Sequence, residues 1–200
     1  TLLKNKTLLT KYIACILMGA PIYFAIGVLW TLAPELAKSM GVIEPIKPML
    51  TVGIGYTGMM LGDLMVGTLS HHFKSRLQPI LFVIVLTGIM LVTFFLSTGM
   101  TSSEYYAFCL ASGITVGYWV NMVTIAAEQF GTNLRATAAT SIPNFVRATL
   151  LPMNMAIAAL KPELGIAMAA LIVGGTVLVI ALAALTRLEE TFGKDLDYHH

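Results

Sequence analysis

Long stretches without a charged residue alternate with short charged segments along the whole chain. An α-helix needs about 20 apolar residues to cross the hydrocarbon core of a bilayer. Two of the stretches carry one charge inside, Asp63 in the second and Arg147 in the fifth. The pattern predicts an all-α polytopic membrane protein with a tail over residues 188–200. The six predicted spans lie near 12–34, 49–70, 79–98, 105–127, 136–160 and 165–186.

The composition agrees with a chain that lies mostly in the membrane. It is 57% hydrophobic and 11% charged, whereas soluble domains carry about 25% charged residues. The net charge of +2 is too small to indicate a nucleic-acid partner. Cys15 and Cys109 both lie in apolar segments, which favours neither a disulfide nor a metal site. No nucleotide-binding loop or catalytic constellation is found, so we expect neither an enzyme nor a cofactor.

The distribution of Lys and Arg predicts the orientation, because these residues gather on the cytoplasmic side of short loops. Three of the 12 basic residues, Lys38, Lys47 and Lys161, flank one side, and Arg147 lies within a span. The other eight flank the opposite side: Lys4, Lys6, Lys11, Lys74, Arg76, Arg135, Arg187 and Lys194. We therefore expect both termini in the cytoplasm, with a bacterial inner membrane as the location.

The two ends of the chain call for separate expectations. The sequence begins at Thr1 rather than at Met, so we expect a piece of a longer polypeptide. His199 and His200 are either native residues or the start of a purification tag, and no function is assigned to them.

Small residues mark several of the spans. Gly58 and Gly62 are four residues apart, as are Gly113 and Gly117, which is the spacing that lets two membrane helices approach closely. Glycines also interrupt the first and fourth predicted spans, and interrupted helices at matching positions of a repeat point to a transporter binding site. Close packing and site formation are both open interpretations.

Three charged segments follow one another in a specific order. The first runs from Gly58 through Asp63 and Gly67 to Arg76, the second joins Glu128 to Arg135, and the third is Glu190-Thr191-Phe192-Gly193. Together they resemble the major facilitator superfamily, and specifically the C-terminal six-helix half in its sugar-porter and metabolite-symporter branch. The tail departs from the family pattern, since Glu189 stands where that branch carries Pro.

The resemblance implies a fold and a mechanism. The six spans would form two inverted triplets of helices, and an N-terminal six-helix half would be the partner within the bilayer. The two halves would rock around a small-molecule site to give alternating access. By the same resemblance, five residues would form a network that closes the cytoplasmic side: Asp63, Arg76, Glu128, Arg135 and Glu190.

Arg147 is the leading candidate for substrate contact. An Arg at the membrane centre costs roughly 2.5–3.5 kcal/mol on insertion scales, and its guanidinium stays charged. It must therefore face a cavity or a partner, and its fork suits a carboxylate or phosphate. A structural Arg paired with an acid or with carbonyls of the other half is the alternative. The remaining candidates are Asn144, Asn121, Tyr118, Tyr23 and Tyr56, with helix–helix hydrogen bonding as the alternative for Asn121.

These observations lead to a functional hypothesis. We expect a secondary transporter for a small organic anion or acidic metabolite, coupled to protons through an acid in the other half, because Asp63 is expected near the cytoplasmic end of its span. The alternatives are a sugar or multidrug transporter of the same superfamily, or a membrane module that self-associates through its glycine faces and transports nothing. No Gln or Asn occurs in the first span, which argues against a neutral hexose.

Overall fold

The computed structural model describes residues 5–194, and these form helices with no strand among them. Residues 1–4 and 195–200 lie outside the described part, and with them Lys4, His199 and His200. The prediction of an all-α chain is confirmed for the described residues. In chain order the elements are α1 (Lys6–Phe24), a π-helical turn η2 (Ala25–Trp30), α2 (Ala33–Ser39), α3 (Pro48–Phe73), α4 (Leu77–Leu96), α5 (Ser102–Val116), α6 (Trp119–Glu128), α7 (Thr132–Ala148) and α8 (Leu150–Leu185).

Five helical stretches are long and apolar enough to cross a membrane, as expected for an integral membrane protein. Most are built from more than one element, so that α1 continues into η2 and α5 continues into α6. The stretches are Lys6–Trp30, Pro48–Phe73, Leu77–Leu96, Ser102–Glu128 and Thr132–Leu185.

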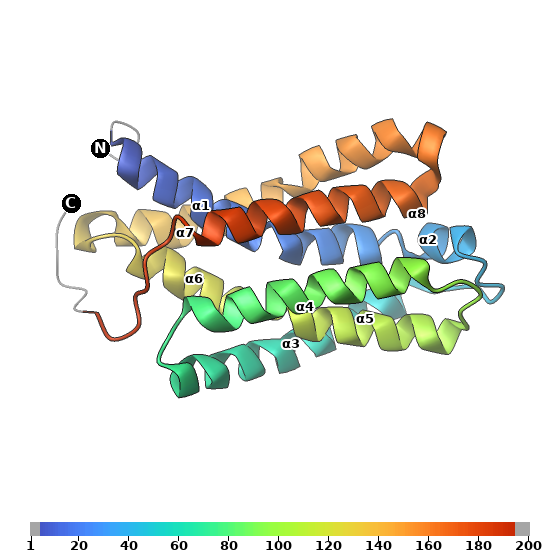
Figure 1. The fold of residues 1–200 in the computed structure, drawn as a ribbon, viewed down its shortest axis with the longest axis horizontal. Helices are drawn as coiled ribbons and strands as arrows, with labels where there is room; N and C mark the ends of the chain where they lie inside the picture. Colours follow the sequence, from blue (N-terminus) through green and yellow to red (C-terminus); the bar gives the residue numbers. More distant parts are fainter. Residues whose placement is uncertain (1–4, 195–200) are drawn as a thin grey trace.

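The fifth stretch is far longer than one crossing requires. Its 54 residues would extend about 80 Å at 1.5 Å per residue, against a hydrocarbon core of about 30 Å. Gly165 interrupts it with φ 76° and ψ 162°, a conformation that a side chain would disfavour. The chain reverses there, so that the two parts of α8 run back along each other (Figure 1).

Local sequence signals explain where the helices begin and end. Asn5 caps α1 by accepting hydrogen bonds from the amides of Thr7 and Leu8, and Thr101 and Glu104 form a capping box at the start of α5. Pro48 occupies the first turn of α3, where its missing N–H costs nothing. Lys74 ends α3 in the left-handed conformation with φ 49°.

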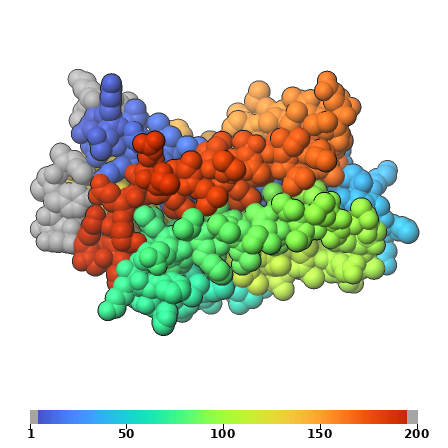
Figure 2. All heavy atoms as spheres, in the orientation of Figure 1, coloured from blue at the N-terminus to red at the C-terminus, as the bar shows by residue number. Residues whose placement is uncertain are grey.

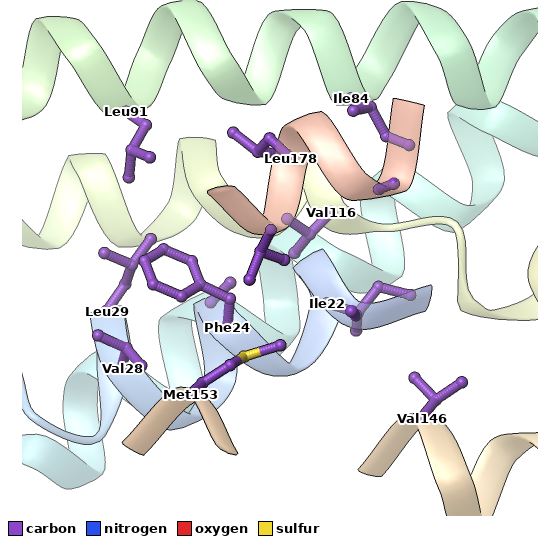
Figure 3. Close-up of a cluster of buried hydrophobic side chains, with 14 of the residues drawn as sticks. Ile22, Phe24, Val28, Leu29, Ile84, Leu91, Val116, Val146, Met153 and Leu178 are labelled. Atoms are coloured by element: carbon purple, nitrogen blue, oxygen red, sulfur yellow. The ribbon is translucent and has the colours of Figure 1, made fainter. Parts of the chain in front are cut away.

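The first helix is the most enclosed part of the bundle. In its most apolar window 72% of the residues are buried, against 28% in α3. Phe24 and Leu29 point towards Leu91 of α4, and Met153 of α8 lies beneath them (Figure 3). The core is therefore built around α1 and η2, with the other long helices packed against it.

The most aliphatic helices lie at the outside. The second half of α8 and α4 run side by side across one face of the molecule (Figure 2). Phe82 and Ile89 of α4 are exposed there, as is Val179 of α8. Exposed aliphatic side chains on these two helices are typical of a surface that faces lipid.

The closest helix contact joins α3 to α5 through glycines. A Cβ built on Gly62 would lie 2.2 Å from the carbonyl oxygen of Ile114, and one built on Gly113 would lie 2.2 Å from that of Gly55. Gly117 approaches the backbone of Gly62 and Asp63 in the same way. The predicted packing role of the two glycine pairs is confirmed, because each pair lies against the other.

This contact predicts a difference between two neighbouring glycines of α3. Gly62→Ala should lower the free energy of unfolding by about 1–3 kcal/mol, because the new methyl group overlaps a backbone carbonyl that cannot move aside. Gly67→Ala should be neutral or stabilising, since nothing lies within 4 Å of its Cβ position and Ala favours a helix. The thermal unfolding midpoints of the two variants in detergent measure these two effects. Equal midpoints would contradict a close backbone contact at Gly62.

Candidate functional site

A cavity of about 630 Å³ opens between four parts of the chain. These are the end of α1 with η2, the middle of α3, the start of α6 and the end of α7. Among its lining residues are one cation, one carboxylate and three large aromatic side chains. The lining residues are Tyr23, Ile26, Tyr56, Met59, Met60, Asp63, Leu64, Trp119, Val120 and Arg147.

Arg147 is exposed at the wall of this cavity. It lies near the end of α7, about midway between Thr132, where the helical stretch begins, and Gly165, where the chain reverses. Its Nε donates a hydrogen bond of 3.1 Å to the hydroxyl of Tyr23 on α1. The guanidinium nitrogens Nη1 and Nη2 carry no hydrogen bond to another described residue, so the fork is available to a ligand.

Aromatic side chains form the rest of the polar wall. Tyr23 meets Trp119 edge to face with ring centroids 5.9 Å apart. Tyr56 packs in the same way on Trp30, at 5.8 Å. Trp30 is itself fixed, because its indole N–H donates to the hydroxyl of Ser112 at 2.8 Å. Tyr56 is therefore held at the cavity by a ring that is anchored in the core, and Tyr23 by the partly buried ring of Trp119.

Asp63 does not lie where the sequence placed it. It was expected at the cytoplasmic end of its helix, but α3 continues to Phe73, about 15 Å further along the axis. Asp63 lines the cavity instead, and its Oδ1 accepts a hydrogen bond of 3.0 Å from the amide of Val120. The expectation that Asp63 lies near the end of its span is therefore wrong.

The carboxylate of Asp63 caps a broken helix. Gly117 and Tyr118 leave helical geometry between α5 and α6, so the first amides of α6 have no partner within their own helix. Asp63 supplies an acceptor for one of these amides. Its negative charge also interacts favourably with the positive end of the α6 dipole. The glycine contact explains the position, because Gly62 and Gly117 touch and place Asp63 directly beside this break.

Three of the six predicted substrate residues line the cavity, namely Arg147, Tyr23 and Tyr56. The other three do not. Tyr118 is fully buried and donates to the carbonyl oxygen of Met18 at 2.9 Å. Asn144 is exposed one turn before Arg147 and donates to Thr140 on its own helix at 3.0 Å.

Asn121 is enclosed in the bundle, with 6% of its surface exposed. Its Nδ2 has no hydrogen-bond partner among the described residues. Neither of the two roles considered for it, substrate contact or a helix–helix hydrogen bond, is visible in this arrangement.

The sequence did not predict Asp63 as a cavity residue, although Asp63 stands directly after Gly62, a member of one of the two glycine pairs. Pairing the two glycine motifs across a helix interface would have placed Asp63 beside Gly117.

The charged residues at one end of the bundle form a connected cluster. Arg76 lies 3.2 Å from Glu128, and the hydroxyl of Thr191 donates to the other oxygen of Glu128 at 2.5 Å. Glu190 accepts hydrogen bonds from the backbone amides of Arg76 and Leu77 at 2.7 and 3.3 Å. The tail thereby caps α4 and joins the helix ends to one another.

The remaining two members of the predicted network are Arg135 and Asp63. Arg135 lies in the first turn of α7. Asp63 is not part of the cluster, because its partner is the start of α6. The structure therefore brings Arg76, Glu128 and Glu190 together at one end and places Asp63 in the cavity.

The environment of Glu190 changes its acidity. Burial tends to raise the pKa of its carboxyl group, but hydrogen bonds from the Ser75 hydroxyl and from the amides of Arg76, Phe192 and Leu77 outweigh burial and hold the pKa below its usual value. The pKa of Glu189 is also lowered, first of all by the hydrogen bond from Lys11.

No protein-family model matches this chain, and no curated protein matches it either.

The acidity of Glu190 predicts how stability depends on pH. A carboxyl group whose pKa is lowered by folding stabilises the fold above its unfolded value of about 4.5, and this contribution is lost as the pH falls through the folded value. Glu190→Gln should lower the free energy of unfolding by about 1 kcal/mol at neutral pH, as expected for loss of a cap. Below pH 4.5 the stability of the Glu190→Gln variant should fall less than that of the wild type. Thermal unfolding of both proteins in detergent measures this difference. Equal acid losses in both proteins would assign the effect to other groups.

Proposed function

We propose that this chain is the substrate-binding part of a membrane transporter for a small organic anion. The observation that carries the proposal is Arg147, an exposed guanidinium within the helical stretch Thr132–Leu185, at the wall of a cavity of about 630 Å³. Ionisable residues within membrane segments generally mark a substrate or ion pathway. The size of the cavity also falls in the range typical of small-molecule sites.

The surroundings of Arg147 favour an anion over a neutral solute. Tyr23 holds Nε at 3.1 Å, which orients the guanidinium while the rest of its fork stays available to a carboxylate or phosphate. Tyr56 adds a second phenol to the wall. A hydroxyl group donates readily to an anionic oxygen, so the three side chains form one anion-binding region.

Alternating access requires two bundles that move against each other, and we propose that this chain is one of them. The reversal at Gly165 divides the fifth helical stretch, and this division supports the proposal of six crossings. The rim of the cavity exposes Met60 and Leu64 of α3. A second six-helix bundle packed on this rim would cover these side chains and complete the site.

The charged cluster at the end of the bundle supports a gate. Arg76, Glu128 and Glu190 connect the α3–α4 turn, the end of α6 and the tail. Ion pairs that join helix ends can hold one conformation and release it when the helices separate. We propose that this cluster stabilises one state of the transport cycle on the cytoplasmic side, and proton coupling stays a prediction.

Self-association through glycines is less well supported. The glycine pairs of α3 and α5 already pack against each other within the chain. Those faces are therefore not available for another copy.

The proposal predicts ligand stabilisation that depends on Arg147. A ligand at 100 times its dissociation constant stabilises the folded state by about 2.7 kcal/mol. Carboxylates or phosphates should raise the unfolding midpoint of the full-length wild type, and Arg147→Gln should abolish the rise.

Arg187→Gln is the matched control, because Arg187 lies outside the cavity. It should respond to anions as the wild type does. Equal responses of the wild type and Arg147→Gln, or stabilisation by neutral sugars alone, would refute an anion transporter.

A further inference from the structure

The cavity contains fixed charges of both signs. Asp63 of α3 and Arg147 of α7 line the same space. Within residues 5–194, no salt bridge joins either of them to an oppositely charged side chain. A carboxylate and a guanidinium that share one cavity without pairing leave two ends at which a ligand can be bound.

Local contacts keep the two charges apart. The amide of Val120 holds the Asp63 carboxylate at 3.0 Å, and the hydroxyl of Tyr23 holds the Arg147 side chain at 3.1 Å. Trp119 links these two anchor points, since it precedes Val120 in α6 and its ring contacts that of Tyr23. The cavity therefore has an acidic end, an aromatic wall and a basic end.

We infer that the cavity binds an amphoteric solute with one anionic and one ammonium group. The anionic group is held by Arg147 with the tyrosines, and the ammonium group by Asp63 with Trp119. This inference rests on the proposed function and narrows its substrate class from organic anions to amphoteric ones.

The chemistry of the acidic end supports a cation. A carboxylate can accept about four hydrogen bonds, and the cap on α6 uses Oδ1 for one of them. An ammonium group beside a carboxylate gains a charge-assisted hydrogen bond, and a nearby indole attracts a cation through its ring.

The same end disfavours a simple anion. Met59, Met60 and Leu64 make much of the surrounding wall apolar, and charges interact more strongly in such surroundings than in water. A monoanion on Arg147 meets uncompensated repulsion from Asp63, whereas an amphoteric solute replaces that repulsion with attraction. The charge of Asp63 therefore weakens the binding of a simple anion, the ligand that Arg147 alone would favour.

Asp63→Asn separates the ligand role from the structural one. Asn caps helices about as well as Asp does, so the bond to Val120 and the start of α6 are retained. The variant removes only the negative charge from the cavity. Glu163 is an exposed residue of α8 that lies outside the cavity, and Glu163→Gln serves as the matched control because it also removes one negative charge.

The experiment compares solutes that differ only in an amino group. Binding of β-alanine, γ-aminobutyrate and ε-aminocaproate is measured calorimetrically on the full-length protein at neutral pH, beside propionate, butyrate and caproate. The wild type and Glu163→Gln should bind at least one amino acid about tenfold more tightly than the matched carboxylate, the effect of one hydrogen bond to a charged group. Asp63→Asn should lose this preference and bind the carboxylate at least as tightly as the wild type does.

Two results would overturn the inference while the anion site stands. One is equal wild-type affinity for the amino acid and its matched carboxylate, with both lost in Arg147→Gln. The other is an equal loss of affinity for both ligands in Asp63→Asn, which would show that Asp63 acts only as a helix cap. Absence of any Arg147-dependent binding is a different result, and it would overturn the proposed function together with this inference.

Discussion

The approach of α3 to α5 is the contact on which the rest of the site depends. Glycines on both helices let the backbones touch, and a single methyl group on Gly62 would meet a carbonyl oxygen at 2.2 Å. Because the helices meet so closely, Asp63 reaches the break between α5 and α6 and caps the new helix that starts there. One steric condition therefore determines both the packing of α3 on α5 and the position of the carboxylate in the cavity.

Asp63 and Arg147 show how a membrane protein can carry charges within its long helical stretches. Neither is neutralised by the other. Asp63 is stabilised by a helix N-terminus and Arg147 by a tyrosine hydroxyl, and both border an open cavity in place of the packed core. Each charge thus has one permanent neutral partner and keeps the capacity to meet a ligand. A direct ion pair would have satisfied both charges and closed the site.

The charged cluster at the end of the bundle caps α4. The amides at the start of α4 need acceptors, and Glu190 from the tail supplies them. Arg76 and Glu128 pair beside it, and the ring of Phe192 lies 5.3 Å from the Arg76 guanidinium. Segments that are distant in sequence are joined here by polar contacts at one end of the bundle.

The sequence by itself determined the helical class and the approximate positions of the long apolar stretches, because hydrophobic length is a property of local composition. It placed Arg147 among the candidates for substrate contact, which stays a prediction. It also identified the two glycine pairs, but not that they face each other. The tertiary structure decided that Asp63 belongs to the cavity and not to the end of the bundle, that Tyr118 is part of the core, and that Trp119 links the two charged ends. The physical reason is that these assignments depend on which helix faces meet, and a helix crossing is decided by the shapes of two segments together.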